Sequence, residues 1–182
     1  MLVKKYYEKI PDYKTYCLIG QLIRQLQLKY CPRKLYNLTT LRLINIGLTG
    51  LPESIGQLRN LQVLHLSNNK LSSLPESIGQ LRNLQELYIH DNKLSILPES
   101  IGQLRNLQVL HIHDNKLSSL PESIGQLGNL NELYLRKNNL NKLPESIGQL
   151  PQLHKINIDS DKLDIKNKTM LLSSKIQIIQ WY

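Results

Sequence analysis

The chain has 182 residues, of which 41% are hydrophobic and 20% are charged, with 8 prolines and 9 glycines. This composition is ordinary for a folded protein, and it excludes a disordered chain, a collagen-like fibre and a small domain held together by disulfides. The formal net charge is +9, yet residues 51–165 are nearly balanced, with 11 basic and 12 acidic side chains, so the excess lies at the two ends. No apolar run is long enough for a membrane span, and residues 1–9 are too polar for a secretory signal, which favours a cytoplasmic protein.

The first element in chain order is expected to be a helical cap over residues 1–27. Between Tyr13 and Tyr30 apolar side chains recur at steps of three and four, the pattern of an amphipathic helix. The only cysteines, Cys17 and Cys31, fall in this part of the chain at a spacing that fits no metal motif. We expect them to be free thiols, as in a reducing compartment, with a disulfide as the alternative.

A repeat of constant length follows the cap and occupies most of the chain. The octapeptide Leu-Pro-Glu-Ser-Ile-Gly-Gln-Leu recurs every 23 residues, beginning at Leu51, Leu74, Leu97, Leu120 and Leu143. Residues 28–50 align with these copies without gaps but lack the central Pro-Glu-Ser-Ile-Gly. Residues 28–165 are therefore predicted to form six repeats, the first of them degenerate.

Each repeat is predicted to hold one short strand and one compact return path. In the second repeat Leu64 and Leu66 alternate with Val63, His65 and Ser67, which indicates a strand with one buried face. Pro52 and Gly56 are expected to open and close a short turn. Because one unit cannot bury its leucines alone, stacked units must share a core. An asparagine that can satisfy backbone groups leaving the strand recurs as Asn69, Asn92, Asn115 and Asn138.

The pattern L-x-x-L-x-L-x-x-N-x-L, preceded by L-P-x-x-I-x-x-L, resembles the leucine-rich repeat family over residues 28–165. The version with Leu-Pro-Glu-Ser-Ile-Gly is similar to the 23-residue class of Ras-binding scaffolds, plant intracellular Ras-group proteins and bacterial effectors. The resemblance implies an α/β fold, a right-handed solenoid with a parallel β-sheet on its concave face. It also implies a non-catalytic module that binds another protein, a small GTPase or a host protein, and an effector would be exported by dedicated machinery.

The last segment, residues 166–182, is expected to cap the other end of the stack. Its final run alternates apolar and polar residues, so it is predicted to add an edge strand and to lay Trp181 across the open core. The same run is apolar enough, at Ile176, Ile178, Ile179 and Trp181, to support a second hypothesis, a homodimer formed through this edge. A monomer is expected if the segment folds back as a cap.

Function is expected on the positions that the repeat leaves free, which lie in columns along the concave sheet. Side chains at the same column position on neighbouring strands lie about 4.8 Å apart, so Tyr88, His111 and Tyr134 should form a continuous aromatic stripe. Tyrosine and histidine combine large contact area with a polar tip, as at the centre of a binding surface. The residues expected to contact a partner are His65, Glu86, Tyr88, His90, Asp91, Val109, His111, His113, Asp114, Glu132, Tyr134 and Arg136.

An alternative hypothesis is a metal site formed by the concave histidines. His90 and His113 share a column and could hold a transition metal, with Asp114 completing the set. No local H-x-x-x-H or C-x-x-C motif supports it, and the leading interpretation involves neither metal nor cofactor. Histidines within a protein interface would instead make affinity change between about pH 5.5 and 7.5.

Catalysis and nucleic-acid or membrane binding find little support. No G-x-S-x-G, P-loop or dinucleotide fingerprint is present, and a ladder of identical residues such as the repeated glutamate is typical of a scaffold. The basic ends contain no run denser than Lys4-Lys5 or Arg33-Lys34, so solvated cap surface accounts for their charge.

Overall fold

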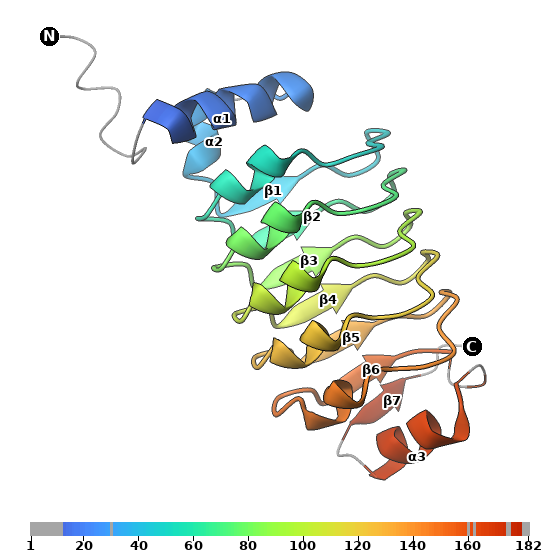
Figure 1. Ribbon diagram of the computed structural model, residues 1–182. Helices are drawn as coiled ribbons and strands as arrows, with labels where there is room; N and C mark the ends of the chain where they lie inside the picture. Colours follow the sequence, from blue (N-terminus) through green and yellow to red (C-terminus); the bar gives the residue numbers. More distant parts are fainter. Residues whose placement is uncertain (1–12, 30, 160, 162, 174–175, 180–182) are drawn as a thin grey trace, which may run out of the picture.

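The computed structural model describes residues 13–29, 31–159, 161, 163–173 and 176–179, which form a curved stack of repeats (Figure 1). One parallel sheet runs through the described part, with its strands in chain order from β1 to β7. The strands are β1 (Thr40–Arg42), β2 (Val63–His65), β3 (Glu86–Tyr88), β4 (Val109–His111), β5 (Glu132–Tyr134), β6 (Lys155–Asn157) and β7 (Gln177–Ile179). The leucine-rich repeat fold predicted from the sequence is thereby confirmed.

Short 3-10 helices form the return path on the other side of the core. They are η2 (Glu53–Gln57), η3 (Glu76–Gln80), η4 (Glu99–Gln103), η5 (Glu122–Gln126) and η6 (Glu145–Gln149). The proline ahead of each helix has an extended backbone in η2 to η5, and its carbonyl accepts the first N–H of the turn, as in Ile55 N to Pro52 O at 3.0 Å. Neighbouring helices pack closely because each carries a glycine: a Cβ added to Gly56 would lie 2.7 Å from the Ser77 carbonyl oxygen.

The core is a column of leucine and isoleucine between the strands and the 3-10 helices. Leu64, Leu87, Leu110 and Leu133, the central residues of four strands, are fully buried and stand side by side in register. Each residue therefore packs against the equivalent residue of the repeats on both sides. This arrangement supplies the apolar burial that one repeat could not reach alone.

The repeated asparagines join each repeat to the one before it. Asn92 Nδ2 donates to the carbonyl oxygens of Leu66, at 3.0 Å, and Ile89, at 3.1 Å, and its Oδ1 accepts the N–H of Leu71 at 3.0 Å. One amide thus satisfies three backbone groups that leave the sheet, which removes the penalty of burying them unpaired.

The amino-terminal end is covered by two helices, α1 (Tyr13–Gln25) and α2 (Pro32–Tyr36). The amphipathic helix predicted between Tyr13 and Tyr30 is shorter than expected, because Gln27 adopts a left-handed backbone with φ 51° just beyond its end. Leu22 of α1 is fully buried, which closes the core at this end. Residues 1–12 lie outside the described residues.

The carboxyl-terminal end differs from the prediction in its first half. Helix α3 (Ile165–Ser173) precedes the predicted edge strand, in a stretch where no helix was expected, and β7 does add a parallel strand to β6. Asp161 does not replace the missing ladder asparagine: Asn167 of α3 accepts the N–H of Leu143 at 2.9 Å and donates to its carbonyl at 3.0 Å. The predicted placement of Trp181 lies outside the described residues.

Candidate functional site

Four aromatic rings stack along the concave face, one from each of β2, β3, β4 and β5. The ring centroids are separated by 4.4 Å between His65 and Tyr88, by 4.9 Å between Tyr88 and His111, and by 3.9 Å between His111 and Tyr134. The rings of the first and third pairs are nearly parallel, at 4° and 16°. Parallel register sets this spacing, because Cα partners such as His65 and Tyr88 are direct neighbours on adjacent strands. The result is a ribbon of half-buried rings, which we call the aromatic stripe.

A glutamate two residues before each tyrosine holds its hydroxyl group. Tyr88 donates to Glu86 at 2.7 Å, and Tyr134 donates to Glu132 at 2.5 Å. Burial, and then the bond to Glu86, raises the pKa of Tyr88 to about 12, so this hydroxyl stays protonated at ordinary pH. The bond from Tyr134, which outweighs burial, lowers the pKa of Glu132 with the help of Lys155.

A second pair of imidazoles lies beside the stripe, just past the ends of β3 and β4. The rings of His90 and His113 stack with centroids 4.5 Å apart and 10° between their planes. His111 meets both edge-on, at 6.3 Å and 5.9 Å. His90, His111 and His113 therefore form one group, which we call the imidazole cluster.

The aspartates beside this cluster also serve the chain turn. Asp91 and Asp114 each have φ 54°, a left-handed backbone that aspartate tolerates better than most residues. Their carboxylates meet the imidazoles, at 2.8 Å from His90 Nδ1 to Asp91 and 2.9 Å from His113 Nδ1 to Asp114. Burial favours a raised pKa for Asp114, but hydrogen bonds from His113 and Lys137 outweigh it and lower the pKa. Both aspartates thus have a structural role that sequence reasoning had not assigned to them.

The protonation of the stripe differs from what the sequence suggested. Burial lowers the pKa of His111 to about 4, and the neighbouring imidazoles His113 and His90 add to the effect. Burial also lowers the pKa of His65, assisted by Arg42. His111 is therefore neutral over the whole range from about pH 5.5 to 7.5, in which an interface histidine of ordinary pKa would titrate. The expected pH response does not apply to this residue.

A shallow hollow opens at the carboxyl-terminal side of the stripe. It has a volume of about 270 Å³ and is lined by His111, His113, Asp114, Tyr134, Arg136, Lys137 and Asn157. Arg136 in this wall is paired with Asp159, at 3.2 Å between Nε and Oδ1. Lys155 Nζ lies 5.2 Å from the ring centroid of Tyr134 and 3.3 Å from Glu132. Sequence reasoning left Lys155 and Asp159 out of the site, although their column positions placed them beside Glu132 and Arg136.

The remaining predicted residues are placed as follows. Val109 lies half-buried on β4, between Glu86 and Glu132 in register. Ser67 and Asn157 stand one repeat from His90 and Tyr134 in the same columns, so the same pattern would place them on the free face, but they are buried, at 3% and 4% exposure. Asn157 is covered because its side chain donates to the Ile179 carbonyl of β7 at 2.8 Å. The accessible part of the concave face thus ends at β5 and at the half-buried Lys155 of β6.

One group in the described part of the chain has the composition of a metal site. It consists of His90, Asp91 and His113, whose potential ligand atoms all lie within 4.8 Å of one another. The carboxylate of this group is Asp91, whereas the sequence suggested Asp114. Asp114 is engaged by Lys137, at 3.0 Å from Nζ to Oδ1.

Comparisons with known proteins agree with this architecture. A sequence model described as a leucine-rich repeat region matches residues 15–115 and 99–174. Because these matches cover most of the chain, the protein belongs to the leucine-rich repeat family, whose members are generally protein-interaction scaffolds without catalytic activity. No curated protein matches the chain.

Three solved structures illustrate the likeness. A leucine-rich repeat protein of Leptospira interrogans is 38% identical with a TM-score of 0.75, covering 83% of this chain and 40% of that one. The leucine-rich repeat domain of the type III effector XopL is 26% identical with a TM-score of 0.66, covering 85% and 62%. The ectodomain of the receptor kinase SOBIR1 from Arabidopsis thaliana is 30% identical with a TM-score of 0.59, covering 68% and 71%.

This chain therefore spans less than two thirds of the first two of these structures. Among the helices in the described ranges, none is long and apolar enough to cross a lipid bilayer.

Proposed function

We propose that this protein is a non-catalytic module that grips another protein with its concave face, centred on the aromatic stripe. The observation that carries the proposal is the continuous stack of half-buried rings formed by His65, Tyr88, His111 and Tyr134, at a position where the residue varies between repeats. Preorganised aromatic rings lose little side-chain entropy on binding and bury a large area, as binding hot spots do. Glu86 and Glu132 present carboxylates beside the rings, which suits a partner with aromatic and basic side chains.

The type of partner follows from the similarities as a hypothesis. The likeness to the type III effector XopL supports a bacterial effector that acts on a host protein, and the 23-residue repeat supports a signalling scaffold that binds a small GTPase. In either case the concave face would be the contact surface. A cytoplasmic location is proposed for the scaffold, and delivery into a host cell for the effector.

The test is affinity capture from host lysate and from source lysate, with a matched pair of triple variants. Y88A/H111A/Y134A removes the stripe, and K93A/K116A/N139A removes three exposed side chains from the same repeats, each five residues beyond the stripe residue of its repeat. We expect the first variant to lose the partner and the second to retain it. Retention by both variants would refute the concave site, and circular dichroism shows whether each variant is folded.

A second candidate function is metal binding by His90, Asp91 and His113, favoured by their grouping within 4.8 Å. Two imidazoles and a carboxylate suit Zn²⁺ or Ni²⁺, with ligands at about 2.0 to 2.1 Å from the ion. Small side-chain rotations would draw the three atoms together, since donors around a tetrahedral ion are about 3.3 Å apart.

Calorimetric titration with zinc chloride tests this candidate. Saturable heat is expected for the wild type and for H154A, a histidine outside the group, but not for H90A or H113A. Absence of saturable heat in the wild type would exclude the site while leaving the protein-binding proposal intact.

Self-association through β7 is a further arrangement that the same samples test. Ile178 and Ile179 of β7 are half-buried, and β7 is the last strand of the described sheet. Light scattering that reports one chain across a range of concentrations would support a monomer, and a doubled mass would support a dimer.

A further inference from the structure

A row of arginines runs along the edge of the solenoid at which the chain leaves each 3-10 helix and approaches the next strand. Arg59, Arg82 and Arg105 occupy the same position in successive repeats, and all three are exposed. We call them the arginine row. They lie at the opposite end of the strands from Lys70, Lys93 and Lys116, which follow the strands in the same repeats.

The backbone of each arginine is held by the scaffold, while its guanidinium group is not. The side-chain amides of Asn83 and Asn106 donate to the carbonyl oxygens of Arg59 and Arg82, at 2.9 Å and 2.8 Å. Asn129 does the same for Arg105 at 2.8 Å. Within the described part of the chain, no ion pair or hydrogen bond reaches any of the three guanidinium groups. The fold therefore fixes where these cations stand and leaves their donors unused.

This lack of partners separates the arginines from other residues that recur along the repeats. Glu53 accepts the N–H of Ser77 at 3.0 Å, and Asn92 satisfies backbone groups of two repeats, so these ladders have a structural cause. The arginine side chains have none. Three like charges on adjacent repeats repel one another, and an isolated fold gains nothing from aligning them.

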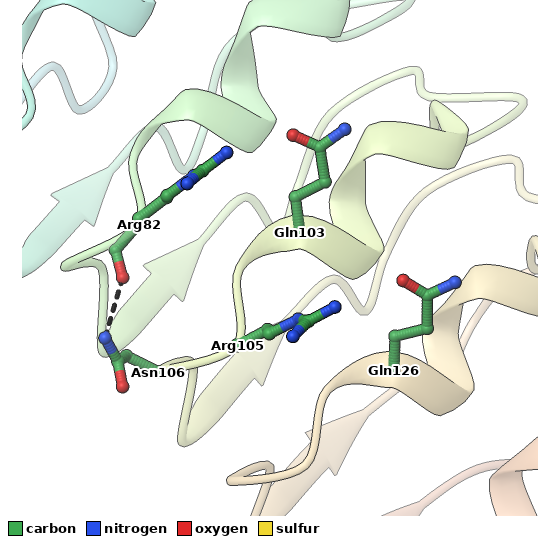
Figure 2. Close-up of a pocket in the computed structure, with 5 residues that line it drawn as sticks. All are labelled: Arg82, Gln103, Arg105, Asn106 and Gln126. Atoms are coloured by element: carbon green, nitrogen blue, oxygen red, sulfur yellow. Dashed lines mark hydrogen bonds between the residues drawn. The ribbon is translucent and has the colours of Figure 1, made fainter.

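Two hollows lie between the members of the row. The first has a volume of about 310 Å³ and is lined by Arg59, Gln80, Arg82 and Asn83. The second has a volume of about 370 Å³ and is lined by Arg82, Gln103, Arg105, Asn106 and Gln126. Figure 2 shows the side chains of Arg82 and Arg105 extending in the same direction from successive repeats, with Gln103 and Gln126 beside them. No carboxylate lines either hollow.

We propose that the arginine row is a second binding surface, which takes an extended acidic peptide segment of a partner protein. A guanidinium group pairs with a carboxylate through two parallel hydrogen bonds, so each arginine supplies an anchor for an acidic side chain. The glutamine and asparagine amides between the arginines both donate and accept. They match the N–H and C=O groups of a peptide backbone, whereas a phosphodiester backbone offers only acceptors.

The length of the row also favours a peptide. The equivalent positions in the next two repeats are Gly128 and Pro151, so the cations end after three repeats. Three charges suit a short acidic segment, and the uncharged residues at the next two positions of the row give a longer nucleic acid no further cations along it. The surface lies away from the aromatic stripe, so one partner could engage both or two partners could bind independently.

The test measures anisotropy of a fluorescein-labelled octaglutamate peptide at low salt. R59Q/R82Q/R105Q removes the row, and K70Q/K93Q/K116Q removes the same charge from the same repeats at the other end of the strands. We expect affinity to fall by about ten-fold or more in the arginine variant and by less than about two-fold in the lysine variant. Equal losses in both variants would mean that net charge alone attracts the peptide, and the proposal would fail.

A gain-of-function variant keeps the test independent of any folding defect. The backbone at Gly128 repeats that of the arginines: Gly128 N donates to Gln126 O at 2.9 Å, as Arg105 N donates to Gln103 O at 2.9 Å. A Cβ at Gly128 would meet nothing within 4 Å. G128R should therefore extend the row by one repeat and tighten octaglutamate binding by about two-fold or more.

An oligothymidylate of equal charge decides between peptide and nucleic acid. The proposal expects it to bind more weakly than octaglutamate and to be indifferent to G128R. Tighter binding of the oligothymidylate, lost in R59Q/R82Q/R105Q, would overturn the peptide assignment. Capture of a partner by the aromatic stripe is measured in a separate experiment. A negative result for one surface therefore leaves the proposal for the other surface intact.

Discussion

The concave and convex sides of the repeats are built from the same 23-residue unit but differ in what their side chains do. On the convex side the same residues recur because each repeat contacts the next one at equivalent positions: Gly56 packs onto Ser77, and Gly79 onto Ser100. On the concave side the residue changes from strand to strand, as from Val63 to Glu86 in register. Repetition therefore marks contacts between repeats, and variation marks positions that the stack does not constrain. The predictions below challenge this division, beginning with the largest effect.

The buried leucines should carry most of the stability. Leu110 is fully buried at the centre of β4, between Leu87 and Leu133. L110A leaves a cavity shared by three repeats, so we expect a loss of about 2 to 5 kcal/mol in the free energy of unfolding. Urea denaturation followed by circular dichroism measures it, and a loss below about 1 kcal/mol would contradict the shared core.

The asparagine ladder should come next. Asn115 satisfies the N–H of Leu94 at 2.9 Å and the carbonyls of Ile89 and Ile112 at 2.9 Å and 3.1 Å. N115A leaves these buried groups unpaired, and we expect a loss of about 2 to 3 kcal/mol. Asn139, which is exposed and whose backbone N–H donates to Leu117, is the control. Equal losses of unfolding free energy for N115A and N139A would show that the repeated asparagines do not stabilise the stack.

Close packing of the 3-10 helices predicts a smaller effect from adding a single methyl group. A Cβ at Gly79 would lie 2.5 Å from the carbonyl oxygen of Ser100, so two neighbouring helices must separate. We expect G79A to cost about 1 to 3 kcal/mol. G128A meets nothing within 4 Å and should be neutral within about 0.5 kcal/mol in the same denaturation experiment.

The repeat step predicted the fold because every stacked contact depends on residues that recur at that step. The ends have no such periodicity, and there the sequence was less informative. Helix α3 was missed because its residues belong to no copy of the repeat, and the substitution of Asn167 for the ladder asparagine is visible only once α3 is placed. The repeat pattern also did not predict the left-handed backbone at Asp91 and Asp114.

The columns predicted which residues share the concave face, but not how those residues interact. The stack from His65 to Tyr134 follows from strand register, whereas the low pKa of His111 depends on burial by its neighbours. The arginine row was overlooked for a different reason: its members repeat, and repetition suggested a scaffold role. Only the structure shows that no ion pair or hydrogen bond from the described residues reaches their guanidinium groups.

The smallest predicted effect concerns the tyrosine hydroxyl of the aromatic stripe. Y88F removes the 2.7 Å bond to Glu86 but keeps the ring between His65 and His111. Because this bond is partly exposed and the carboxylate returns to water, we expect a loss of less than about 1 kcal/mol in the free energy of unfolding. Since the hydroxyl of Tyr88, with a pKa of about 12, is never ionised near neutrality, the loss should not change between about pH 6 and 9.

Y88F also separates the two sides of the repeat. If the concave residues do not stabilise the stack, L110A should lower the free energy of unfolding several-fold more than Y88F does. Only the stripe variants should weaken capture of the partner. A destabilisation by Y88F comparable with that of L110A would show that the stripe holds the solenoid together. The concave face could then no longer be taken as the surface that the repeat leaves open to a partner.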